Sequence, residues 1–178
     1  MPNSNFTYAI SITTPHQVNL VVGCPTCTAT DPFTTWQNQY FTAGELANPA
    51  FSGPGADPLG KGMSNTNQFL AGFNPTNAAA YVHITGIVKT NSNTDVFVSY
   101  LGASGDSSTT PPMASRTNVL EFTMGTANGS YSSNNFTSTG VSNILSGGVG
   151  LGTLTNMVDP GGATNKPSRY YRIRVLVP

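Results

Sequence analysis

From residue 81 to residue 177, the chain is a succession of short strand-like segments separated by turn residues. Residues 94–101 place Val96, Val98 and Tyr100 at every second position, which is the period of a half-buried strand. Further strands are expected at 81–88, 118–124, 130–137, 141–145, 150–158 and 169–177. Short strands with turns about every 8–12 residues predict a mainly β fold built as a β-sandwich.

The last of these segments has two different faces. One face carries Tyr171, Ile173, Val175 and Val177, and the other carries Tyr170, Arg172, Arg174 and Leu176. The first four residues are expected to belong to an edge strand. Together with Arg169, the two arginines form a basic cluster, which we interpret as a solvated strand face or as charges that protect the edge. Nucleic-acid binding would need a wider basic surface.

The N-terminal region contains another alternating strand. Residues 5–13 read NFTYAISIT and place four apolar side chains on one face: Phe6, Tyr8, Ile10 and Ile12. Residues 17–22 form a second short apolar strand. No tight-turn sequence separates the two strands, so they need not pair with each other. We regard residues 1–30 as an N-terminal extension.

The only two cysteines, Cys24 and Cys27, are separated by two residues. We favour a small-loop disulfide formed in an oxidising compartment. A thioredoxin-type redox pair would need a βαβ context that the sequence lacks. Half of a zinc site would need His16 and His83, which are far apart in the sequence. Free thiols or cross-links between subunits remain open as well.

Residues 31–47 carry helix signals. Asp31 precedes Pro32 as a cap, and Thr42 and Glu45 have the spacing of a capping box. We expect Trp36 to pack its helix onto the neighbouring sheet rather than to serve as a ligand platform. A second helix is expected at 65–72, with Phe69 and Leu70 facing inward and Gly72 ending it.

Two stretches resemble a known architecture. Residues 34–77 read TTWQNQYFTAGELANPAFSGPGADPLGKGMSNTNQFLAGFNPTN, and residues 168–178 read SRYYRIRVLVP. They are similar to a module of secreted and surface proteins of verrucomicrobial and planctomycete bacteria, in which WxxxxFTxxELxxP leads into DPDGDGxSNxxEFxxGTxPT and an FYRVR strand closes a sandwich. The resemblance implies a fibronectin-III-like or immunoglobulin-like β-sandwich at residues 79–178, preceded by a helical segment with a calcium-type loop at residues 31–76.

The calcium-type loop has lost most of the acids that the resemblance implies. Asp57, Asn65 and Gln68 keep oxygen atoms at ligand positions, and Gly62 keeps the turn. Leu59 and Lys61 stand where acids are expected, and Gln68 replaces the bidentate acid. A lysine ammonium repels a cation, so we expect no metal and a loop that is held by turn chemistry and by Lys61.

The composition argues against several functional classes. Charged residues make up 8% of the chain, with seven basic and seven acidic residues and a net charge of zero, whereas about 25% is typical of soluble domains. Such a surface has no electrostatic attraction for nucleic acids or anionic membranes, and it gives little repulsion between copies. No apolar run reaches the roughly 18 residues of a membrane helix, so membrane insertion is not expected.

The sequence lacks the motifs that would support catalysis. Its acids are scattered, one histidine adjoins Pro15 and the other, His83, is expected inside a strand. Nucleophile-elbow, zinc-protease and phosphate-loop motifs are absent. The glycine-rich residues 147–152 neither follow a βαβ strand nor precede a helix. We therefore expect a non-enzymatic protein without a cofactor.

These patterns together favour a structural role outside the cell. The closing strand of the resembled sandwich is normally followed by one more, whereas this sequence stops at Pro178, so we expect an open edge. The N-terminal strand has the alternation needed to fill such an edge in another copy, and a head-to-tail contact of this kind produces a filament. The expected partner is a second copy of the chain. The alternatives are a strand that folds back onto its own sandwich, and a monomeric carbohydrate-binding or adhesive module with a polysaccharide as partner.

Overall fold

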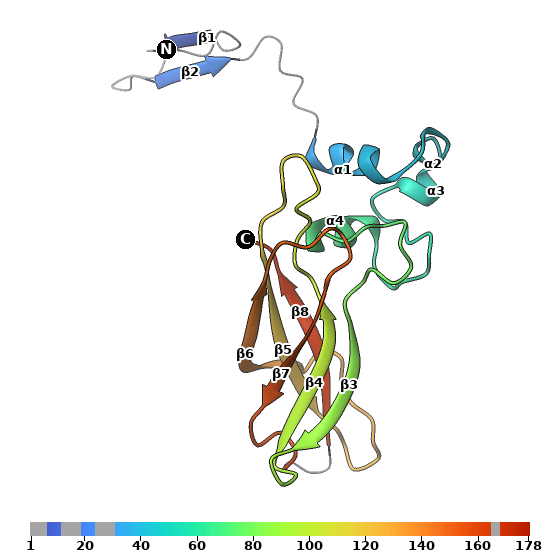
Figure 1. Cartoon of the computed structure of the whole chain (residues 1–178), viewed down its shortest axis with the longest axis vertical. Coiled ribbons are helices and arrows are strands. Elements are labelled where there is room, and N and C mark those ends of the chain that lie inside the picture. Colours follow the sequence, from blue (N-terminus) through green and yellow to red (C-terminus); the bar gives the residue numbers. More distant parts are fainter. Residues whose placement is uncertain (1–6, 12–18, 24–30, 165–167) are drawn as a thin grey trace. The chain divides into compact units, whose positions relative to one another are not determined.

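The computed structural model describes residues 7–11, 19–23, 31–164 and 168–178 of the chain. These residues fall into two compact units, Met1–Pro32 and Phe33–Pro178 (Figure 1). The helical segment and the sandwich, which the sequence suggested as separate domains, therefore share one unit. None of the helices in the described ranges is long and apolar enough to cross a membrane.

The first unit contains a two-stranded antiparallel sheet. Strand β1 (Thr7–Ser11) pairs with β2 (Asn19–Gly23). Their register places Tyr8 opposite Val22 and Ile10 opposite Leu20. The two N-terminal strands thus pair with each other, a possibility that the sequence had left open.

The second unit is mainly β, as predicted, and contains two antiparallel sheets of three strands each (Figure 1). The first sheet has the order β3-β4-β7, from β3 (His83–Thr90), β4 (Asp95–Gly102) and β7 (Thr153–Asp159). The second has the order β6-β5-β8, from β5 (Arg116–Met124), β6 (Thr137–Leu145) and β8 (Arg169–Leu176).

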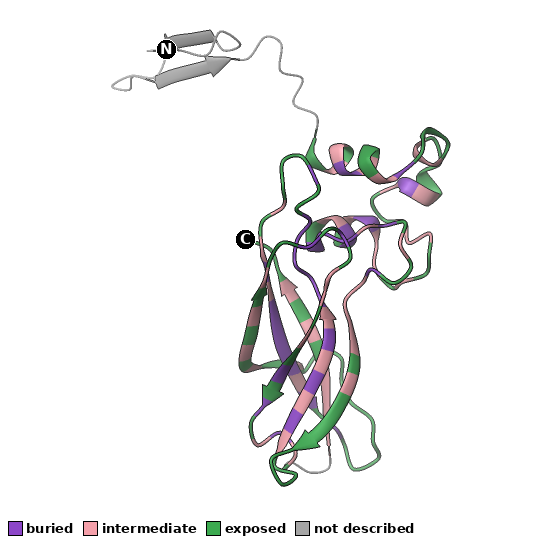
Figure 2. Ribbon diagram, viewed as in Figure 1, coloured by how far each residue is buried: buried purple, intermediate pink, exposed green. Residues whose placement is uncertain are grey.

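The two sheets enclose a common apolar core (Figure 2). In β4, buried residues alternate with half-buried ones, and Val96, Val98 and Tyr100 are all buried, as their spacing predicted. They pack with Leu120 of the other sheet and with Met157 of β7. Tyr171 and Ile173 of β8 cover this cluster from one side while remaining partly exposed.

One strand prediction was wrong. Two weak strands were expected at 130–137 and 141–145, but the structure has a single strand β6 that begins at Thr137. Residues before it form the connection from β5, in which Gly129 has a positive φ of 77° and Thr126 N–H donates to the carbonyl oxygen of Ser130. A turn at this point prevents residues 130–136 from continuing as a strand.

Four short helices gather at one end of the sandwich (Figure 1). They are α1 (Pro32–Tyr40), α2 (Ala43–Leu46), α3 (Pro49–Ser52) and α4 (Asn65–Ala71). The predicted capping box of Thr42 and Glu45 begins α2, and Gly72 ends α4 in the left-handed conformation. Helix α3 begins at Pro49 because Asn48 caps it and proline fits the first helical position.

Trp36 is 1% exposed. Its aromatic neighbours are Phe33, Tyr40, Phe41 and Phe69, which belong to α1, the residue after it and α4. These rings form an aromatic cluster among the helices. A ring buried in this way offers no platform for a ligand.

Candidate functional site

Strand β8 lies at one end of the sheet order β6-β5-β8. One edge of β8 pairs antiparallel with β5, from Thr117 opposite Leu176 to Met124 opposite Arg169. No strand of the described residues pairs with the other edge. An open edge presents unpaired N–H and C=O groups, which are a template for another strand.

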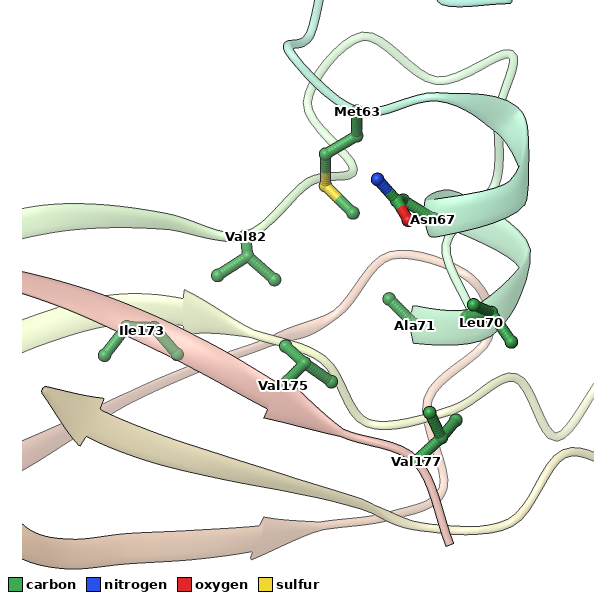
Figure 3. A pocket seen from close by; sticks show the side chains of 8 residues that line it. All are labelled: Met63, Asn67, Leu70, Ala71, Val82, Ile173, Val175 and Val177. Carbon is green, nitrogen blue, oxygen red and sulfur yellow. The ribbon is translucent and has the colours of Figure 1, made fainter. Parts of the chain in front are cut away.

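A cavity of about 370 Å³ lies beside the end of this strand (Figure 3). Its lining comes from three places in the chain. The strand β8 and its continuation contribute Ile173, Val175 and Val177, the residue before β3 contributes Val82, and α4 with its preceding turn contributes Met63, Asn67, Leu70 and Ala71. Apart from the amide of Asn67, every lining side chain is apolar.

Two further cavities continue along β8 toward its beginning. The middle one, of about 270 Å³, shares Val82 and Ile173 with the first. The third, of about 280 Å³, shares Tyr171 with the middle one and reaches Lys89 and Arg169. We call these three adjoining cavities the edge groove. It follows the open edge of β8 from Arg169 to Val177 and lies between this strand and β3.

Lys61 fixes one wall of the edge groove. Its ammonium Nζ donates hydrogen bonds to the carbonyl oxygens of Asn74, Asn77 and Ala80 at 3.1, 3.0 and 3.2 Å. These bonds tie the turn before α4 to the segment that leads into β3, so they connect the neighbourhoods of Met63 and Val82. Burial lowers the pKa of Lys61 to about 8, and the negative charge of Asp57 partly opposes that shift.

The side chains of the calcium-type loop make hydrogen bonds to the protein's own backbone. The Asp57 carboxylate already accepts hydrogen bonds from the backbone N–H groups of Lys61 and Gly62, at 2.9 and 2.7 Å. The buried Asn65 and Gln68 donate through their amide nitrogens to backbone carbonyls. In the described ranges, no three His, Cys, Asp or Glu side chains are grouped so that they could hold a metal ion.

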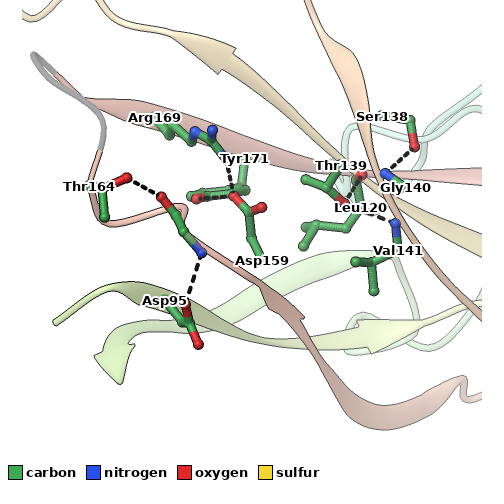
Figure 4. Close-up of polar contacts among 11 residues, drawn as sticks. Asp95, Leu120, Ser138, Thr139, Gly140, Val141, Asp159, Thr164, Arg169 and Tyr171 are labelled. Carbon is green, nitrogen blue, oxygen red and sulfur yellow. Dashed lines mark hydrogen bonds and ion pairs between the residues drawn. The ribbon is translucent and has the colours of Figure 1, made fainter. Parts of the chain in front are cut away.

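At the other end of the edge groove, a buried carboxylate binds two of the lining residues. Asp159 of β7 forms an ion pair with Arg169 and accepts a hydrogen bond of 2.8 Å from the Tyr171 hydroxyl (Figure 4). Burial, together with the hydrogen bond to Asp159 and its negative charge, raises the pKa of Tyr171. The contacts hold β8 against β7 of the opposite sheet.

The arginines of the basic cluster of β8 are ion-paired within the protein. Glu121 of β5, which is 4% exposed, forms ion pairs with both Arg172 and Arg174. Burial acts to raise the pKa of Glu121, but the hydrogen bonds and charges of the two arginines outweigh burial and lower it. All three arginines of the cluster thus contact a buried carboxylate, since Arg169 contacts Asp159.

The structure brings together only some of the residues that the sequence singled out. Tyr171, Ile173 and Val175 lie in β8, and Val177 directly follows it, so all four line the edge groove. Tyr8 and Ile10 lie in β1. The predicted residues Phe6, Ile12, Cys24 and Cys27 are outside the described residues.

Sequence reasoning missed the α4 wall of the edge groove. Leu70 was expected to face inward with Phe69, but it is 40% exposed and lines the cavity. A signal was present, because Asn67, Leu70 and Ala71 follow the spacing of one helical face. What the sequence does not indicate is that this face lies beside β8.

Comparisons of the chain with protein-family models, with curated proteins and with solved structures found no match.

Proposed function

We propose that this protein is a non-enzymatic structural subunit that polymerises outside the cell by β-strand addition. The N-terminal strand of one copy, residues 5–13, would pair with the open edge of β8 in the next copy; we call it the donor strand. The observation that carries the proposal is the edge groove, which places an apolar trough along an unpaired strand edge. Strand addition uses both features, because the backbone supplies hydrogen bonds and the trough receives alternate side chains.

The strand order supports a vacant position beside β8. If β3, β4, β5, β7 and β8 are taken as strands A, B, C, E and F of a fibronectin-III-like or immunoglobulin-like sandwich, β4 and β7 pair as B and E do, and β5 and β8 pair as C and F do, with β6 in the place of C′. In that family of folds the seventh strand, G, pairs with F. The donor strand would take the position of G.

The donor strand has the side-chain pattern that the edge groove requires. Four apolar residues alternate in it, and four residues of β8 and its continuation alternate along the groove. Burying four side chains of this size contributes about 6–12 kcal/mol before the loss of translational and conformational freedom is subtracted.

Pairing of β1 with β2 is compatible with strand addition. A strand in a two-stranded sheet uses one edge for its partner and keeps the other edge available. Strand β1 can therefore join β8 while it remains paired with β2. The donor would then be a two-stranded ribbon, which costs less ordering entropy than a free segment.

A groove-filling variant tests the proposal. Asn67 is exposed and lines the cavity at the α4 end of the edge groove, so Asn67→Trp places a large ring in the groove without changing the core. Ser142→Trp is the matched control, because Ser142 is exposed on β6 and lies opposite Val119, away from β8. Negative-stain microscopy and sizing would compare both with the native chain and with a chain that lacks residues 1–13.

We expect filaments from the native chain and from Ser142→Trp, but monomers from Asn67→Trp and from the truncated chain. Thermal unfolding would verify that Asn67→Trp is folded. Filaments from the truncated chain would contradict the proposal.

A second function, carbohydrate binding by a monomer, has one observation in its favour. Tyr131 is 51% exposed and stacks on Tyr170 with ring centroids 4.5 Å apart, beside Phe136. A flat exposed ring of this kind can pack against a sugar face. A native chain that stays monomeric and loses polysaccharide binding on Tyr131→Ala would favour this function over the first.

A further inference from the structure

The two ends of the edge groove differ in size and chemistry. At the α4 end the cavity measures about 370 Å³, and its apolar lining includes Met63 and Val177. At the opposite end the cavity measures about 280 Å³ and includes the cationic side chains of Lys89 and Arg169. The middle cavity, of about 270 Å³, includes His83 and Arg172. A strand that enters this groove therefore meets a different environment in each of its two possible directions.

The donor strand is also asymmetric. Its aromatic residues, Phe6 and Tyr8, come first, and its aliphatic residues, Ile10 and Ile12, follow. Aromatic rings bury more surface than an isoleucine side chain does and gain most in a roomy apolar site. Isoleucine fits a smaller cavity and can cover the aliphatic stems of lysine and arginine. Matching the larger residues to the larger cavity orients the strand.

Backbone pairing favours the same direction. Each pair of neighbouring strands in the described sheets is antiparallel, including both pairs that β5 makes. Parallel ladders are slightly less stable per residue than antiparallel ones. A strand that runs antiparallel to β8 starts at the end of β8 near Val177 and finishes near Arg169. Its first residues then lie at the α4 end.

We infer that the donor strand binds antiparallel to β8, with Phe6 in the α4-end cavity beside Val175 and Val177 and with Ile12 toward Tyr171 and Arg169. This inference rests on the proposed function, and it adds the polarity and the approximate register of the contact. Successive groove-facing residues are about 6.6 Å apart on both strands, so the four positions of one strand match the four of the other. The polarity also fixes where the donor chain leaves the groove, at the end that Lys89 and Arg169 form.

Intermolecular disulfides between introduced cysteines distinguish the two directions. The full-length chain, with Cys24→Ser and Cys27→Ser to remove the native thiols, would carry Phe6→Cys together with Val175→Cys or Val177→Cys. The comparison chain would carry Ile12→Cys with the same acceptor positions. Residues directly opposite each other in an antiparallel pair have Cα atoms about 4.5–5.5 Å apart, which a disulfide can bridge. A reversed strand would move residue 6 roughly 20 Å away, beyond that reach.

After mild oxidation of the filaments, we expect a ladder of cross-linked chains on a non-reducing gel for Phe6→Cys and none for Ile12→Cys. A ladder for Ile12→Cys alone would overturn the inferred polarity and leave the proposed function intact. Filaments without a ladder for either chain would overturn both. If a doubly substituted chain does not assemble, donor and acceptor cysteines would be placed on separate copies, both carrying Cys24→Ser and Cys27→Ser, and co-assembled in equal amounts. Cross-linked dimers would then give the same comparison.

Discussion

Lys61 connects its loop to the segment that leads into β3. Asp57 accepts hydrogen bonds from the backbone N–H groups of Lys61 and Gly62, and the Lys61 ammonium is bound to three backbone carbonyls. The sequence predicted that Lys61 would help to hold this loop. It could not predict the acceptors, because they lie 13 to 19 residues further along and depend on the path of the chain into β3.

Replacing Lys61 with methionine should remove a dependence of stability on pH. Burial lowers the pKa from the ordinary 10.5 to about 8 in the folded protein, so the folded state loses this proton before the unfolded state does. The contribution of Lys61 to the free energy of unfolding therefore increases as the pH rises from about 8 to about 10.5. This increase is absent at lower pH. Denaturant titrations of both proteins at pH 7 and pH 10 would measure the difference, since tyrosine ionisation is common to both. An equal change in both proteins would contradict the low pKa.

At the scale of secondary structure, the end of α4 is the most constrained junction. Gly72 has a φ of 77°, and a Cβ atom there would lie 2.5 Å from the backbone of Gly105. Gly72→Ala should lower the free energy of unfolding by about 2–4 kcal/mol, from the left-handed backbone and the steric overlap together. The matched control is Gly60→Ala, which has a φ of 65° but no atom within 4 Å of the added Cβ.

Gly60→Ala should lower the free energy of unfolding only by the cost of the left-handed backbone, about 1–2 kcal/mol. Chemical denaturation of both variants would measure the two contributions. Equal losses would mean that the contact between Gly72 and Gly105 is not tight. Because α4 provides a wall of the edge groove, Gly72→Ala should also weaken assembly more than Gly60→Ala does.

The sequence predicted individual helices and strands better than it predicted the contacts between them. Local signals identified the caps of α2 and α4 and the alternation of β4, because these depend on neighbouring residues. The pairing of β1 with β2 and the single strand β6 depend on contacts over longer distances. The edge groove is the extreme case, since its walls come from residues 63–96 and 162–177 and no local pattern relates them.

The charge distribution of the whole molecule predicts how assembly responds to salt. The net charge is zero, and residues 5–13 contain no charged side chain. Arg169 and Arg172, which line the edge groove, already contact Asp159 and Glu121. Ionic attraction between copies should therefore contribute little, and the contact should depend on apolar burial and backbone hydrogen bonds.

Raising sodium chloride from about 0.05 to about 0.5 M should change the critical concentration for assembly by less than about threefold, although the Debye length falls severalfold over that range. Sodium sulfate at equal ionic strength should lower the critical concentration, because excluded salts strengthen apolar burial. Pelleting assays of the native chain would measure both series, with Ser142→Trp as a control for a changed surface outside the groove. A steep rise of the critical concentration with sodium chloride would mean that charge pairs hold the copies together, and the donor strand would then not be the principal contact.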